Sequence, residues 1–154
     1  MIRKTGFTLV EVLLVVAIFG ILAGIGFLNI RLVWTANQLQ GSTTETIRAL
    51  KEAQNNAMDG ILDSQWGVFF DINNNQFTLF KGPDYSGRDP AHDLATALPK
   101  LIKITNINLN GGGTEIVFEK TSGKTNHYGS LTMEGFNSQT KTLILNQYGV
   151  IETY

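Results

Sequence analysis

The sequence predicts an α+β protein, in which a long N-terminal helix, first transmembrane and then amphipathic, precedes a small antiparallel β-sandwich-like head. Three observations predict it. Residues 7–28 form a run of 22 positions with a single charge, and apolar residues then recur at helical spacing to about residue 59. After Gly60 the apolar period changes from 3.6 to 2. A chain of 154 residues leaves room for one compact core beside such a helix.

The composition argues against several classes of function. The net charge is −1, from 12 Lys+Arg and 13 Asp+Glu, so nucleic-acid binding is an unfavoured main role, because phosphate neutralisation requires a basic surface. The chain has no cysteine, which excludes disulfides, thiolate metal sites and a cysteine nucleophile. His92 and His127 are isolated, and no Ser-His-Asp or paired-carboxylate pattern stands out. We therefore expect no enzymatic activity and no cofactor.

The apolar run predicts one membrane span over residues 7–30. A helix needs about 20 apolar residues to cross the bilayer core. Arg3 and Lys4 precede the run, so the positive-inside rule places the N-terminus in the cytoplasm and the head outside. Ala23 and Gly24 could imitate a signal-peptide cleavage site, but the apolar run continues past them.

A specific motif lies at the start of this run, where residues 4–11 read Lys-Thr-Gly-Phe-Thr-Leu-Val-Glu. It resembles the type III leader of type IV pilins and type II secretion pseudopilins. In that family a prepilin peptidase cuts after the glycine and N-methylates the new terminal phenylalanine. The resemblance implies a leader peptide over residues 1–6, cleavage between Gly6 and Phe7, and methylation of Phe7.

Glu11 is the candidate assembly residue. A carboxylate at membrane depth costs roughly 2.5–3.5 kcal/mol, so such residues are functional candidates by default. The resemblance supplies a partner, the positive N-terminus of a neighbouring subunit, whose pairing would neutralise both charges and fix the axial stagger of the helices. The alternative is that Glu11 of a simple membrane anchor reaches the lipid headgroups.

The helical pattern continues beyond the span. Apolar residues recur at spacings built from three and four, namely Leu39, Ile47, Leu50, Ala53, Ala57 and Ile61. We therefore divide the chain into the leader 1–6, a transmembrane and filament-core helix 7–30, its amphipathic continuation 31–60, and a β-rich exported head 61–154. Gly20 and Gly24 have small-xxx-small spacing, which either eases helix packing or lets the helix lose order on assembly. The sequence leaves both interpretations open.

The sequence of the head predicts seven short strands, arranged as an antiparallel sandwich or as two packed sheets. The expected strands are 66–70, 77–81, 101–109, 114–119, 128–134, 140–146 and 148–153. Residues 82–100, which contain all three prolines, are expected to be irregular. This order resembles the pilin fold of the minor-pilin branch that includes pseudopilin H of type II secretion.

Two segments could be taken for calcium sites. Residues 71–75 begin like a calcium loop, but Gln76 stands where the sharp turn needs glycine, so we interpret them as a hairpin turn. Asp84, Asp89, His92 and Asp93 cluster in the irregular segment and are either calcium ligands or turn formers. The glycines at 111–113 lack the Lys-Ser/Thr of a phosphate loop.

The resemblance implies a structural minor pilin or pseudopilin of a type II secretion pseudopilus or type IV pilus. Its partners would be the prepilin peptidase, other filament subunits, the inner membrane and assembly-platform proteins. The alternatives are a DNA-binding minor pilin in competence, and an uncleaved anchor of an unrelated exported domain. DNA binding would need the lysines at 100, 103, 120 and 124 to gather on one surface, since the tail 150–154 has no cation.

Overall fold

A single helix dominates the first third of the chain. The structure is a computed structural model that describes residues 8–154, with side chains throughout except at 25–33. The chain divides into two compact units, residues 1–34 and residues 35–154. Helix α1 runs from Leu9 to Met58, so the expected long helix is confirmed over these residues.

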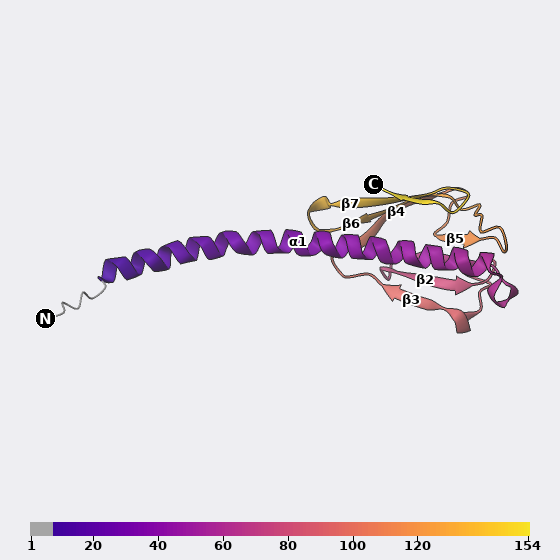
Figure 1. Cartoon of the computed structure of the whole chain (residues 1–154), viewed down its shortest axis with the longest axis horizontal. Coiled ribbons are helices and arrows are strands. Elements are labelled where there is room, and N and C mark those ends of the chain that lie inside the picture. The colour runs from indigo at the N-terminus through magenta and orange to yellow at the C-terminus, as the bar shows by residue number, and fades with distance from the viewer. Residues whose placement is uncertain (1–7) are drawn as a thin grey trace. The chain divides into compact units, whose positions relative to one another are not determined.

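Two antiparallel sheets of four strands form the head, as the sequence predicts (Figure 1). The first has the order β3-β2-β1-β5 and the second β4-β6-β7-β8. The strands are β1 (Trp66–Asp71), β2 (Gln76–Lys81), β3 (Leu94–Ala97), β4 (Lys103–Leu109), β5 (Glu115–Phe118), β6 (Gly129–Glu134), β7 (Thr140–Leu145) and β8 (Ile151–Thr153). Short 3-10 turns lie at Ile61–Asp63, Pro90–His92 and Phe136–Ser138.

The prediction of seven strands is wrong by one, because β3 lies in the segment expected to be irregular. It pairs with β2 alone, with Thr96 opposite Phe77 and Leu94 opposite Leu79. Three of its four residues are exposed. A strand with little buried surface on either face has no reason to alternate, so the period of two that marks the other strands is missing here.

The strand edges of both sheets are short or irregular. Edge strands β3, β5 and β8 have four, four and three residues. The fourth edge strand, β4, is longer, but its register with β6 shifts between Ile104 and Asn106.

The apolar stripe of α1 lies in the core. Leu39, Leu50, Ala53 and Ala57 are buried, as their spacing predicts. Ile61 is a correction, since it is exposed and follows the helix end, where Gly60 adopts a left-handed conformation that terminates the helix.

Polar residues share the buried stripe, which the sequence did not suggest. Thr43 and Thr46 are almost fully buried. The Thr43 hydroxyl donates to the Leu39 carbonyl at 2.7 Å, and that of Thr46 donates to the Ser42 carbonyl at 2.9 Å. Because each hydroxyl is satisfied within the helix, its burial leaves no unpaired polar atom.

One hydrophobic core joins the helix to both sheets. In Figure 1 the second half of α1 is flanked by β2 and β3 on one side and by β6 and β7 on the other. The largest fully buried side chains of the cluster are Phe70, Phe77, Phe118, Leu50, Ile102, Ile116 and Met133. They come from α1, from strands of both sheets and from the segment before β4, so neither sheet has a core of its own.

The connection between β2 and β3 covers the outer face of the first sheet. Tyr85 stacks on Phe69 with ring centroids 3.9 Å apart, and its edge contacts Phe80 at 5.5 Å. The Arg88 guanidinium lies 3.8 Å from the Tyr85 ring centroid. On the sheet, Gly67 makes room for the ring of Phe80, because a Cβ there would lie 2.7 Å from its Cζ atom. The residues expected to be irregular therefore complete a second, smaller apolar layer.

Gln54 ties two distant turns to the helix. Its Nε2 atom donates to the carbonyls of Gly123 and Tyr148, both at 3.0 Å. Gly149 has a left-handed φ of 77°, and a Cβ there would lie 2.0 Å from the same nitrogen. The turn after β5 and the turn before β8 are thus held against α1 by one amide.

Replacing Gln54 should destabilise the head. In Gln54→Ala two carbonyls lose their donor, and we expect a decrease of about 1–3 kcal/mol in the free energy of unfolding. Denaturant titration followed by circular dichroism measures it. Asn55→Ala, at the neighbouring exposed position, is the matched control and should stay close to wild type. Equal stability of the two variants would contradict the role of Gln54.

Candidate assembly site on the N-terminal helix

The first turn of α1 has a side-chain cap. Thr8 directly precedes the helix, and its Oγ1 atom accepts a hydrogen bond from the Glu11 amide at 3.3 Å. The Thr8 carbonyl accepts the Val12 amide, also at 3.3 Å. A threonine followed three residues later by glutamate is the pattern of a capping box. Glu11 therefore occupies the third helical position, where the positive end of the helix dipole favours a carboxylate.

Sequence reasoning missed this cap, although its signal was present. Thr8 and Glu11 both belong to the cleavage motif, and Glu11 is also the candidate assembly residue, but their spacing of three equally predicts a helix start. Gly6 and Phe7 lie outside the described residues, so cleavage between them and methylation of Phe7 stay predictions.

The helix surface from residue 8 to residue 24 is apolar and uncovered. Every side chain in this range is exposed. The large apolar ones are Leu9, Val10, Val12, Leu13, Leu14, Val15, Val16, Ile18, Phe19, Ile21 and Leu22. A continuous apolar surface of this kind marks contact with a protein partner or a membrane.

The membrane span expected over residues 7–30 stays a prediction. Among the residues described with their side chains, no helical stretch reaches the length and hydropathy that a bilayer crossing requires.

Glu11 is the single charged residue between positions 8 and 24. Its side chain is exposed, and within the described part of the chain its carboxylate has no ion-pair partner. When the surrounding apolar surface is covered, an unpaired carboxylate there would lose its water without compensation. A cation supplied from elsewhere would compensate for that loss.

Gly20 and Gly24 lie on the same stretch. No atom lies within 4 Å of the position that a Cβ would take at either residue. Both belong to the continuous helix α1 in the single chain. This spacing of small residues allows a second helix to approach closely.

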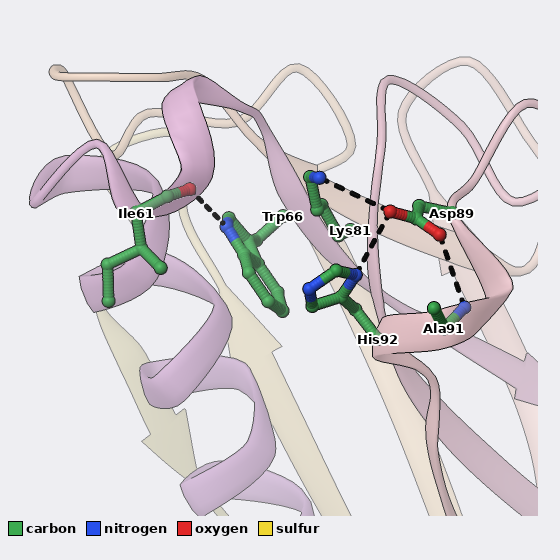
Figure 2. A network of polar contacts seen from close by, with 6 residues as sticks. All are labelled: Ile61, Trp66, Lys81, Asp89, Ala91 and His92. Carbon is green, nitrogen blue, oxygen red and sulfur yellow. Dashed lines mark hydrogen bonds and ion pairs between the residues drawn. The ribbon is translucent and has the colours of Figure 1, made fainter.

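Each acidic residue between positions 82 and 93 has its own hydrogen-bond or ion-pair partners, and these carboxylates do not converge on a common centre. Asp89 accepts the Ala91 amide at 3.2 Å through Oδ1, while Oδ2 pairs with Lys81 Nζ at 3.3 Å and His92 Nδ1 at 3.0 Å (Figure 2). The His92 ring lies edge-on to Trp66, with centroids 6.2 Å apart. The network thus fixes the 3-10 turn Pro90–His92 beside the start of β1.

The other candidate calcium ligands have separate partners. The Asp84 carboxylate accepts the Gly87 amide at 2.6 Å, and Asp93 pairs with Arg88 Nε at 2.7 Å. Asp71 accepts the Asn74 amide at 3.0 Å, as expected for the hairpin turn between β1 and β2. Across the residues that the structure describes, no group of three His, Asp or Glu side chains could hold a metal ion.

The Asp89 network makes the head sensitive to acid. The Ala91 amide, and then Lys81 and His92, hold the pKa of Asp89 below its ordinary value of 3.8. A carboxyl whose pKa is depressed in the folded state contributes stability above its unfolded pKa and loses it as pH falls through the folded pKa. We expect Asp89→Asn to lose less stability than wild type as pH falls below 3.8.

Thermal melts at a series of acidic pH values measure this difference. Asp59→Asn is the control, because Asp59 is exposed and makes no side-chain hydrogen bond in the described structure. It should follow the wild-type pH dependence, and an identical slope for Asp89→Asn would overturn the assignment.

The structure does not gather the four lysines that DNA binding would need. Lys120 pairs with Asp63 just after α1, and Lys124 lies over the Tyr148 ring at 5.5 Å. Lys103 and Gly135 instead line one hollow. A Cβ on Gly135 would lie 3.3 Å from the Thr35 side chain, so this hollow lies near the start of the head. The lysines are therefore divided between opposite ends of the buried part of α1.

Comparisons with known proteins agree with both the motif and the fold. Residues 1–27 match the family model of the prokaryotic N-terminal methylation motif. Two solved structures of the minor pseudopilin EpsH from the type II secretion system of Vibrio cholerae are similar to this chain. The two structures are 11% and 12% identical to this chain in sequence, and their TM-scores are 0.57 and 0.58. Each match covers 76% of this chain. It covers 96% of the first EpsH chain and 93% of the second. No curated protein matches in sequence.

The chain thus carries an N-terminal segment that matches the methylation motif, and its fold is similar to that of the EpsH minor pseudopilin structures.

Proposed function

We propose that the chain is a structural minor subunit of a type II secretion pseudopilus or type IV pilus, and that it is not an enzyme. The observation that carries the proposal is Glu11, a lone exposed carboxylate in the first turn of an uncovered apolar helix. Glu11 lies within the segment that matches the methylation motif, and the fold of the head is similar to that of a pseudopilin. No described feature favours the DNA-binding alternative.

Assembly follows from the chemistry of that first turn. Prepilin peptidase removes residues 1–6 and methylates Phe7, whose amino group becomes the positively charged N-terminus. Glu11 of one subunit pairs with the N-terminus of its neighbour as the apolar helix surfaces pack. Because neither charge is stable alone in a low-dielectric environment, the pair fixes one axial stagger between subunits.

Before assembly the subunit is held in the inner membrane. The apolar run over residues 7–30 crosses the bilayer once, with Arg3 and Lys4 on the cytoplasmic side and the head in the periplasm. The partners are the prepilin peptidase, other filament subunits and the proteins of the assembly platform. Lipid covers the exposed apolar surface until neighbouring helices replace it.

Removal of the Glu11 charge should block incorporation into filaments. Glu11→Ala and the isosteric Glu11→Gln should insert and be cleaved normally, because the apolar run and the leader are unchanged. Their amount in sheared filaments, measured by immunoblot against the membrane fraction, should fall to background. Glu45→Gln removes an exposed charge farther along α1 and is the matched control. Normal incorporation of Glu11→Gln would rule out charge pairing.

Protein isolated from its host should begin at a methylated Phe7. Mass spectrometry of the N-terminal peptide measures both the cleavage and the methyl group. The same protein from cells without the peptidase should begin at Met1. A chain that starts at Met1 in cells with active peptidase would refute the processing step.

A further inference from the structure

Two of the connections between strands meet at the end of the head that α1 enters. In Figure 1 the β6–β7 turn lies at this end of the head. A Cβ on Gly135, in that turn, would lie 3.3 Å from the Thr35 side chain and 3.4 Å from that of Ile102. The segment between β3 and β4 therefore meets the β6–β7 turn beside the first buried residues of α1.

Both connections expose a large apolar side chain there. Leu101 is 55% exposed and Phe136 is 48% exposed. Leu101 borders the same hollow as Gly135, the residue before Phe136. Gly135 and Gln139 close the turn through a 2.8 Å backbone hydrogen bond, and Asn137 and Ser138 both have left-handed φ angles. Two non-glycine residues in that conformation are costly, so the turn is a defined feature of the fold.

Two lysines lie close to Leu101 in the sequence, and one of them borders the same hollow. Lys100 and Lys103 are exposed and flank Leu101, while Lys141 lies on β7 opposite Met133. Glu134 is the acidic residue beside them, opposite Lys103 in the β4–β6 register. In the described structure none of the three lysines forms an ion pair. Large apolar side chains among free lysines are the pattern of a surface that binds anionic lipid headgroups.

With the proposed membrane span over residues 7–30, the length of the chain limits how far this end can lie from the bilayer. Thr35 follows the expected end of the membrane span, residue 30, by five residues, which reach at most about 18 Å when fully extended. Trp34, directly before Thr35, is of the residue type enriched at membrane interfaces.

We propose that Leu101, Phe136, Lys100 and Lys103, here called the basal surface, dock on anionic phospholipid headgroups of the inner membrane before assembly. The inference rests on the membrane insertion in the proposed function. Docking holds the unassembled head against the bilayer, and packing of the subunit into a filament then has to lift it away.

The absence of cysteine makes the test direct, because single labels can be placed. The full chain is inserted into vesicles of phosphatidylcholine alone or of phosphatidylcholine with phosphatidylglycerol. A fluorophore on Ser138→Cys reports the basal surface, and one on Ser122→Cys reports the opposite end of the head. Quenching by a headgroup-labelled lipid should rise with phosphatidylglycerol at position 138 and stay constant at position 122.

Charge variants test the mechanism. Lys100→Gln with Lys103→Gln should lower the ratio of docked to undocked head by about fivefold per lysine, and high salt should do the same. Lys51→Gln with Lys124→Gln makes the same charge change elsewhere on the head and should leave quenching unchanged.

The outcomes separate the inference from the proposed function. If the chain is washed from the vesicles by alkaline carbonate, the membrane anchor fails and the docking fails with it. If the chain stays inserted but the label at 138 responds equally in both lipids, the docking alone is overturned. Quenching that follows the protein-to-lipid ratio would assign the basal surface to a neighbouring subunit and would also overturn it.

Discussion

The buried stripe of α1 is the constraint on which the head depends. The two sheets each bury one face, and the residues that join these faces come from the helix, with Ala53 and Ala57 fully buried between larger side chains from the strands. Small side chains at these positions let strands of both sheets lie close to the same helix face. Gln54, on the adjoining face, then fixes two of the turns that connect the strands. The fold of the head is therefore organised from the helix outward.

The same helix has opposite requirements in its two parts. From residue 35 onward the head covers most of its apolar side chains, Met58 at the helix end excepted, whereas between residues 8 and 24 they are exposed. Glu11 lies in the exposed part, where covering the helix with apolar groups would strand its charge. A partner that covers residues 8–24 must therefore supply both an apolar surface and one positive charge. In the proposed assembly, the N-terminus of an identical or related helix, freed by cleavage, would provide both.

Much of the fold could be predicted from the sequence, since periodicity reports burial. The helix, the two sheets and the hairpin at Asp71 follow from residues that alternate between core and solvent. Strand β3 could not be predicted because its side chains are mostly exposed. Thr43 and Thr46 were missed as core residues, because their hydroxyls are satisfied by the helix backbone and the burial of a polar residue carries no periodic signal. The role of Tyr85 and Arg88 depends on a contact with Phe69 and Phe80 across the sheet, which no local pattern contains. At the candidate site, Glu11 could be singled out from its charge alone, but its place in the helix cap required the geometry of Thr8.

The short edge strands bear on how such a protein can polymerise safely. An open sheet edge invites strands of other molecules to pair with it, and proteins limit this by shortening or distorting the edge. Here three edges have only three or four residues and the fourth has an irregular register. The head consequently offers little template for amyloid-like addition, even when many copies are crowded side by side. In the proposed assembly, self-association would instead depend on the helices.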